Sequence, residues 1–140
     1  MSDPARLARR HVLDEHEDVV RTVLDCADAV ADGWPEETAG DRDAVVGPLT
    51  AALDRTDTLA RLPAVLAGAV EAAGYALPAP PVAAPPYVVV TSRGPVLRAT
   101  VEPGRLLVRV DVFAVGRDGA VRYRRTGRTP ESVVRVELTA

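Results

Sequence analysis

The sequence is best introduced by the residue types that it lacks. Its 140 residues include no lysine, asparagine, glutamine or isoleucine, so all 17 basic residues are arginine. The missing lysine excludes a Schiff-base mechanism, and the missing amides exclude an asparagine or glutamine oxyanion donor. A preference for GC-rich codons explains these absences better than selection for a particular chemistry. Any chemistry in this chain therefore has to use arginine, carboxylates, hydroxyls and two histidines.

Cysteine and aromatic residues are also scarce. Cys26 is the single cysteine, which excludes an intramolecular disulfide and fits a reducing compartment. Its thiol is expected to be an inert, small hydrophobic group on an apolar helix face. One tryptophan, three tyrosines and one phenylalanine are too few for a base-stacking platform. Trp34 and Tyr75, just beyond predicted helix ends, are instead expected to seal the core.

Long apolar runs are missing as well. No stretch reaches the roughly 18 consecutive apolar residues that a membrane-spanning helix needs. The pair Arg9-Arg10 is followed by acidic residues, whereas an export signal would continue into an apolar stretch. We therefore expect a cytoplasmic protein that makes no membrane contact.

The chain divides into two parts of opposite charge within one predicted domain, residues 1–140. Residues 1–77 hold 7 arginines and 15 acids, a sum of -8, whereas residues 78–140 hold 10 arginines and 5 acids, a sum of +5. Between a helical part, residues 1–76, and an antiparallel sheet, residues 87–140, lies a connector with five prolines, residues 77–86. Proline density of this kind permits an extended path but neither a helix nor a central strand.

Apolar periodicity in the first part predicts one long helix and two or three short ones. Asp3 and Pro4 have the chemistry of an N-cap and a first helical position, and the apolar stripe that follows predicts a helix over residues 4–32. A shorter helix is predicted from Gly47-Pro48 to about residue 55. Another is predicted from residue 57, kinked or restarted at Pro63 and capped by Gly74.

The second part has the pattern of a four- to five-stranded antiparallel meander. Valine-rich segments 87–91, 96–101, 105–115, 120–126 and 133–138 alternate with turns that contain glycine, proline and serine. In segment 105–115 one face is wholly apolar and should receive the helices, while the other is mixed and partly wet. The predicted fold is α+β, with the N-terminal helices packed on the C-terminal sheet.

Arginines on the mixed side of the sheet are the first candidate for a binding surface. Guanidinium groups that share one surface suit carboxylates or phosphates. The alternative is that arginine is simply the basic residue this chain uses, with Asp111 and Glu137 available to neutralise the surface. The arginines expected to converge are Arg98, Arg105, Arg109, Arg122, Arg124 or Arg125, and Arg135.

The loop after the first predicted strand is the second candidate. Thr91, Ser92, Arg93 and Gly94 combine two hydroxyls, a guanidinium and a residue that tolerates positive φ, which could form an anion-binding nest. Ordinary hairpin turns use the same residue types. The predicted ligand-binding set comprises Thr91, Ser92, Arg93, Gly94, Arg98 and Arg109.

The two histidines give the third candidate. His11 lies opposite the apolar stripe of the predicted long helix, with Glu15 and Asp18 at i+4 and i+7, a spacing that could hold a divalent metal. An ordinary acidic, solvated helix face is the competing interpretation and the one we favour. His16 lies on the apolar stripe, where a core imidazole is expected.

Residues 85–100 and 104–109 resemble a segment of small haloarchaeal proteins of uncharacterised function. The resemblance covers about residues 85–109 and implies no activity. High salt, if it applies, would weaken a purely electrostatic nucleic-acid contact by several powers of ten.

These observations favour a non-enzymatic binding or interaction module without a cofactor. The arginine-bearing sheet face and the 91–95 loop would contact a partner protein or an anionic small ligand, whereas nucleic acid is disfavoured. One alternative is a metal-assisted hydrolase that uses His11, Glu15 and Asp18. The other is a homo-oligomer in which the acidic helices of one copy face the basic sheet of the next.

Overall fold

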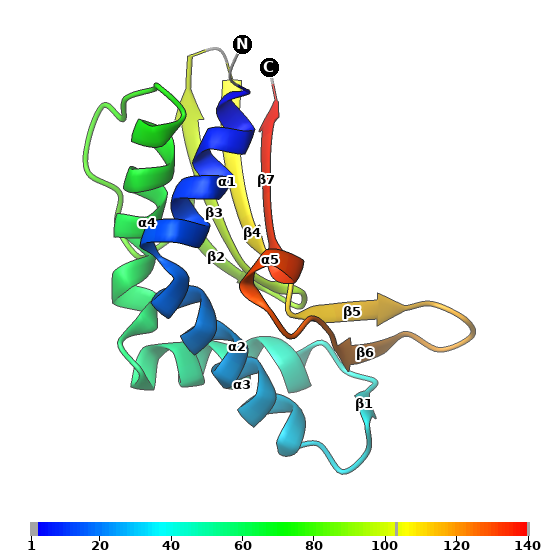
Figure 1. Cartoon of the computed structure of the whole chain (residues 1–140). Coiled ribbons are helices and arrows are strands. Elements are labelled where there is room, and N and C mark those ends of the chain that lie inside the picture. Colours follow the sequence, from blue (N-terminus) through cyan, green and yellow to red (C-terminus); the bar gives the residue numbers. More distant parts are fainter. Residues whose placement is uncertain (1–2, 103, 140) are drawn as a thin grey trace.

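The computed structural model describes residues 3–102 and 104–139 (Figure 1). Its helices are α1 (Pro4–Glu15), α2 (Glu17–Asp32), α3 (Asp43–Arg55), α4 (Thr58–Ala72) and α5 (Pro130–Val133). Its strands are β1 (Thr38–Ala39), β2 (Val88–Thr91), β3 (Gly94–Val101), β4 (Gly104–Val110), β5 (Phe113–Gly116), β6 (Arg122–Arg125) and β7 (Val134–Thr139).

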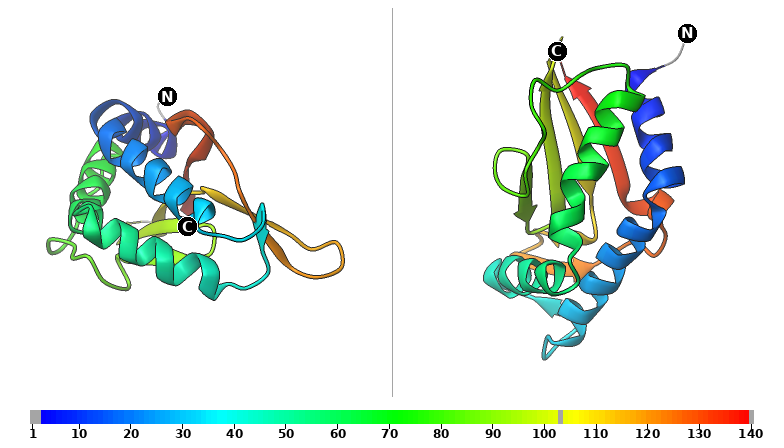
Figure 2. Two further views of the ribbon diagram at one scale, coloured as in Figure 1. Left: turned by 90° about the horizontal axis from the view of Figure 1, so that it is seen from below. Right: turned by 90° about the vertical axis from the view of Figure 1, so that its left-hand side faces the viewer.

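The main sheet has four antiparallel strands in the order β2-β3-β4-β7, and α1 and α4 pack on one of its faces (Figures 1 and 2). Alternate residues of β3 are buried toward the helices, as Leu97, Ala99 and Val101 show. Burying one face of a sheet under amphipathic helices is the arrangement that the apolar alternation favours. The predicted α+β class is confirmed.

The strand order differs from a simple meander. The predicted strand 105–115 breaks at Asp111, and β5 and β6 join β1 in a second, three-stranded sheet, while β7 returns to pair with β4. Figure 1 shows the β5–β6 hairpin projecting away from the main sheet. The break arises because the amides of Val112 and Phe113 both donate to the carbonyl of Arg93, at 2.8 and 3.0 Å, and so leave the β4 ladder. The Phe113 ring then packs on Trp34, with ring centroids 5.6 Å apart.

The prediction of one helix over residues 4–32 is wrong at a single residue. His16 has φ -126° and ψ 25°, which ends α1 and begins α2. Hydrogen bonds from the His16 amide to Val12 and from the Val20 amide to His16 continue across the break, so the chain bends without forming a loop. The bend lets one apolar stripe follow two surfaces: α1 packs on α4 and β7, whereas α2 packs mainly on α3 and also on the α4 helix, α5 and β6.

Helix α3 begins at Asp43, earlier than predicted, and contains Pro48 in its interior. Proline cannot donate a backbone hydrogen bond, so it leaves the carbonyl four residues earlier, that of Ala44, without its helical partner. The indole Nε1 of Trp34 donates to this carbonyl at 3.0 Å. The same bond fixes Trp34 against the core, as predicted for this residue.

Helix α4 ends as the sequence predicts. Gly74 has φ +88°, its amide donates to Glu71, and the amide of Tyr75 donates to Val70. This pair of bonds is the Schellman motif, in which a left-handed glycine closes the last turn. At the other end of the helical part, the Asp3 carboxylate accepts from the Ala5 amide at 3.0 Å, which confirms the predicted cap of α1.

The hydrophobic core draws residues from both parts of the chain, from Ala8 on α1 to Val134 on β7. Cys26 is buried within it. Residues 77–86 form neither helix nor strand, as predicted, and run mostly exposed over the surface. Among the helices of the described residues, none has the length and apolar character needed to cross a membrane.

Candidate functional site

The face of the main sheet that points away from α1 and α4 is called the outer face here. Strand register identifies its residues, because side chains of directly paired residues lie on the same side of a sheet. The pairing rows are Val89, Val96, Arg109 and Arg135; then Arg98, Leu107 and Glu137; then Thr100, Arg105 and Thr139. Four of the predicted arginines therefore share this face.

Part of the positive charge on the outer face is neutralised. Arg109 and Arg135 stand directly opposite each other on β4 and β7, an arrangement that is unfavourable for like charges. The Asp111 carboxylate lies 3.2 Å from Arg109 and 3.5 Å from Arg135, and Glu137 lies 3.4 Å from Arg109. These four side chains form a balanced ion-pair network at one end of the face.

Arg98 and Arg105 are the outer-face arginines outside this network. Neither makes an ion pair or a side-chain hydrogen bond with the residues that the structure describes. Arg98 is half-buried and Arg105 is exposed, and Val96 and Leu107 lie beside them in the register. The face therefore combines unpaired guanidinium groups with apolar side chains.

The predicted nest at residues 91–94 is a tight hairpin turn. Thr91 pairs with Gly94, so only Ser92 and Arg93 connect β2 to β3. The Thr91 hydroxyl donates to the Gly94 carbonyl at 2.7 Å and accepts from the Arg93 amide at 3.2 Å. Gly94 has φ +140°, and a Cβ there would lie 1.9 Å from the Val110 carbonyl oxygen. The turn thus uses the Thr91 hydroxyl and the Arg93 amide internally and leaves the Arg93 side chain exposed.

The arginines of β6 do not join the outer face, contrary to expectation, because β6 belongs to the second sheet. Arg122 donates to the Thr38 hydroxyl at 2.8 Å and pairs with Glu36 at 3.3 Å. Arg124 is exposed and lies opposite Thr38 on β1. Arg125 turns toward α2.

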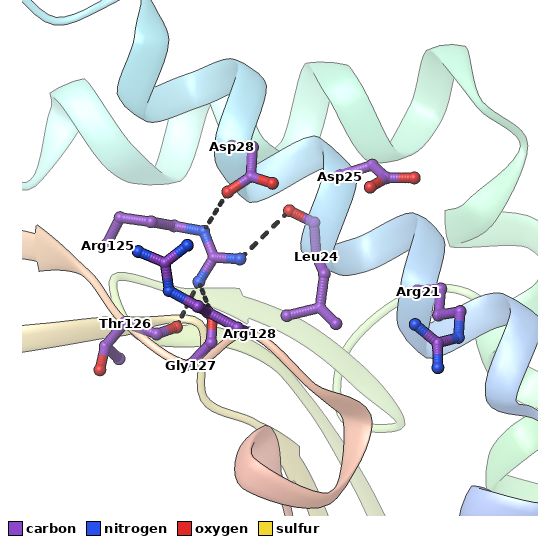
Figure 3. A pocket seen from close by; sticks show the side chains of 8 residues that line it. All are labelled: Arg21, Leu24, Asp25, Asp28, Arg125, Thr126, Gly127 and Arg128. Atoms are coloured by element: carbon purple, nitrogen blue, oxygen red, sulfur yellow. Dashed lines mark hydrogen bonds and ion pairs between the residues drawn. The ribbon is translucent and has the colours of Figure 1, made fainter.

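Arg125 occupies the base of a cleft of about 390 Å³ between α2 and residues 125–128 (Figure 3). Its Nε donates to Asp28 at 2.9 Å, and its two terminal nitrogens donate to backbone carbonyls, those of Val112, Gly127, Thr126 and Leu24. Only 16% of the Arg125 side chain is exposed. Arg21, Asp25 and Arg128 complete the charged lining (Figure 3).

The histidines lie together, in a different arrangement from that expected. His11 does not face the opposite side from His16: the two rings meet edge to face at 5.2 Å, because the bend at His16 interrupts the helical period. Both rings lie on Gly68 of α4, where a Cβ would come within 2.5 Å of the His11 Nε2 and 3.0 Å of the His16 Nε2. Burial, and then the neighbouring His11, lower the pKa of His16 below its ordinary value.

The acidic members of the predicted metal set are directed elsewhere. Asp18 pairs with Arg61 of α4 at 2.5 Å, and this hydrogen bond lowers the pKa of the Asp18 carboxyl. Glu15 is exposed. No group of three metal-ligating side chains comes together within residues 3–102 and 104–139.

The cleft at Arg125 was not predicted from the sequence. Its residues on α2 follow a helical spacing, Arg21, Asp25 and Asp28, which resembles any solvated helix face. The opposite wall comes from residues about 100 positions later in the chain, as the contact of Arg125 with Asp28 illustrates. The sequence feature that could have indicated this cleft is the cluster of four arginines at positions 122, 124, 125 and 128. Tyr123 lies within the same segment.

Comparison with protein families gives one match. The model of the family described as "Domain of unknown function (DUF7988)" matches residues 6–139. No curated protein and no solved structure is similar enough to match the chain.

Proposed function

Since the chain belongs to this family of unknown function, and membership assigns no activity, we propose from the geometry that it is a non-enzymatic binding module. The outer face contacts an acidic surface of a partner protein. The observation that carries the proposal is the pair of guanidinium groups, Arg98 and Arg105, which have no acidic partner among residues 3–102 and 104–139 and lie on the sheet face opposite the helices.

The mixture of side chains supports a protein partner. Arginine beside exposed aliphatic residues is typical of protein interfaces, where the apolar groups exclude water and the guanidinium groups select acids. Val89 is 39% exposed, and Val96 and Leu107 are half-buried on the same face. Asp111 and Glu137 neutralise Arg109 and Arg135, so few arginines of this face remain for the many phosphate contacts that nucleic-acid binding uses, which favours a protein over nucleic acid.

The hydrolase alternative receives no support from the arrangement of its residues. Asp18 is held by Arg61, while the ring nitrogen of His11 faces Gly68. The haloarchaeal origin and the cytoplasmic location remain predictions from the sequence.

The test compares a variant of the outer face with a variant of equal charge elsewhere. Arg98→Ala/Arg105→Ala removes the two guanidinium groups that carry the proposal, and Arg117→Ala/Arg124→Ala removes two exposed ones from the projecting hairpin. Binding of fluorescent poly-L-glutamate, a probe for an acidic polypeptide, is measured by anisotropy for both variants and the wild type. We expect the first variant to bind at least about tenfold more weakly and the control to stay within about twofold of wild type.

Three results would overturn the proposal. The first is equal loss of binding in both variants, which would indicate a nonspecific charge effect. The second is no loss of binding in Arg98→Ala/Arg105→Ala. The third is tighter binding of a single-stranded DNA oligonucleotide than of poly-L-glutamate, which would favour nucleic acid as the partner. Sedimentation of the wild type alone measures its oligomeric state and so shows whether self-association contributes to these results.

A further inference from the structure

The bend at His16 joins two helices that are anchored to the rest of the molecule to different extents. Helix α1, which packs on α4 and β7 (Figures 1 and 2), buries two side chains, those of Ala8 and Val12, whereas α2 buries seven. Arg9 adds hydrogen bonds to one carbonyl of α5 and one of β7, at 2.7 and 3.1 Å. Segments with few buried apolar contacts open locally at a lower free-energy cost than global unfolding. Of the helices longer than one turn, α1 is therefore the one most readily released.

Two imidazole rings meet at this bend and rest on a closely packed part of α4. The rings of His11 and His16 are in edge-to-face contact, with centroids 5.2 Å apart. Both lie on Gly68, where a Cβ would be 2.5 and 3.0 Å from the two Nε2 atoms. Protonation would place two positive rings in contact and would turn both Nε2 atoms into donors that face Gly68 instead of water. The packed arrangement therefore suits neutral rings.

The charged groups around the rings act in both directions. Arg61 of α4 disfavours a positive charge at His16, whereas Asp18 of α2 and Glu15 of α1 favour one. Asp18 is already held by Arg61 at 2.5 Å, and Glu15 is exposed to solvent. The two carboxylates do not compensate for burial and for the neighbouring His11, which lower the pKa of His16. Protonation of His16 is thus opposed as long as α1 stays packed.

We propose that the histidine pair makes this bend a pH-sensitive hinge, at which mild acid releases α1 from α4 and β7 while the rest of the fold persists. In the released state the rings separate and reach water, so protonation favours that state. An imidazole that titrates at about 6.5 when released and stays neutral when packed shifts the equilibrium toward release by up to about tenfold at pH 5.5. Release uncovers the helix-facing side of β7, which carries the partly buried Val136 and Leu138. The hinge lies on the opposite side of the sheet from the outer face, and its test does not depend on binding there.

Hydrogen exchange of the full chain between pH 7.5 and 5.5 tests the hinge, with each amide rate divided by its intrinsic rate at the same pH. We expect the protection of α1 amides to fall at least about threefold over this range, while amides of the interior strand β3 change by less than about twofold. A smaller fall in α1, or an equal fall in β3, would overturn the proposal. So would a fall that occurs mainly below about pH 5, because carboxylates titrate there and imidazoles do not.

Variants then separate the titrating groups from the contacts that hold α1. His11→Gln/His16→Gln removes both rings, and the protection of α1 should then change by less than about twofold between pH 7.5 and 5.5. Arg9→Ala should lower that protection at least about threefold already at pH 7.5, whereas Arg10→Ala, at an exposed site of the same helix, should stay within about twofold of wild type. A pH dependence in the double variant equal to that of wild type, or equal effects of Arg9→Ala and Arg10→Ala, would contradict the hinge. If circular dichroism shows that the double variant does not fold, the wild-type exchange profile and the two arginine variants decide.

Discussion

Two groups of arginines, one on each of the two sheets, have different roles in this chain. On β6, Arg122 and Arg125 use their donors inside the molecule, toward β1 and α2. On the outer face, Arg98 and Arg105 have no acidic partner among the described residues. Because both groups consist of arginine, the difference between them depends on which neighbouring elements each strand packs against. An arginine count therefore does not measure a binding surface until the strand partners are known.

The same comparison explains the division of charge along the sequence. The acidic helical part and the basic sheet part meet within one molecule, through Asp28 with Arg125 and Glu36 with Arg122. Arg9 connects the two parts in the opposite direction: it is an arginine of the helical part, on α1, and it donates to the backbone carbonyls of Val134 and Glu131 in the C-terminal part. The second sheet uses its positive charge for folding, whereas the main sheet keeps part of its charge exposed.

Arg125→Ala should produce the largest effect. It leaves several backbone carbonyls and Asp28 without their donor in a largely buried site, so the free energy of unfolding should fall by about 3 kcal/mol. Urea unfolding measures the change. The adjacent, exposed Arg124→Ala is the control and should lose no more than about 0.5 kcal/mol. If Arg125→Ala and Arg124→Ala lowered the free energy of unfolding by similar amounts, the buried arginine would not differ from an exposed one, and the comparison drawn above would be wrong.

Asp111→Asn should have the next largest effect. The substitution keeps the shape but removes the charge that separates Arg109 from Arg135, and we expect a loss of about 1 kcal/mol at low salt. Because Arg135 is exposed and Arg109 partly so, salt screens the repulsion between them, and the loss should shrink at about 1 M NaCl. Urea unfolding at both salt concentrations checks this, and a loss that does not depend on salt would argue against repulsion.

Lowering the pH should reduce the free energy of unfolding by less than Asp111→Asn does, and it should act through His16, between α1 and α2. The pKa of His16 is lower in the folded protein than its ordinary value of 6.5, because of burial and the neighbouring His11. The unfolded state therefore binds more protons, so stability is complete above pH 6.5 and falls as the pH drops below it. Asp18 and Glu15 oppose this shift and Arg61 adds to it. Urea unfolding at about pH 7.5 and 5.5 should show a smaller pH dependence in His16→Gln than in wild type; equal dependence would exclude His16 as its source.

Arg98→Ala should have the smallest effect on stability, within about 0.5 kcal/mol, because the side chain makes no ion pair within the described part of the chain. Its effect on poly-L-glutamate binding should nevertheless be measurable. Thermal unfolding and anisotropy on the same sample separate the two quantities. A large loss of stability would place Arg98 with the arginines of β6.

Local signals in the sequence predicted local structure well. The cap at Asp3, the left-handed turn at Gly74 and the apolar face of the sheet each depend on neighbours within a few residues. The break at His16 was missed because it results from packing on α4 and β7, which helical periodicity does not contain.

The candidate sites show the same limit. Register within 96–109 places Arg98, Arg105 and Arg109 on one face, and that pairing is between sequence neighbours. Arg125 is paired with Phe113 of β5, and its contact with α2 depends on the break at Asp111 that separates β5 and β6 from the main sheet, for which the sequence gives almost no signal. The cleft at Arg125 therefore required coordinates, whereas most of the outer face did not.

The contact between Trp34 and α3 has a consequence for how this sequence can change. The indole occupies a carbonyl that is free because residue 48 is proline. Any other residue at position 48 would restore an amide directed at the same oxygen, which has two lone pairs and could accept both bonds, so the indole would no longer be its sole donor. Loss of the indole is therefore expected to cost most while residue 48 is proline, which couples two positions that lie 14 apart in the chain.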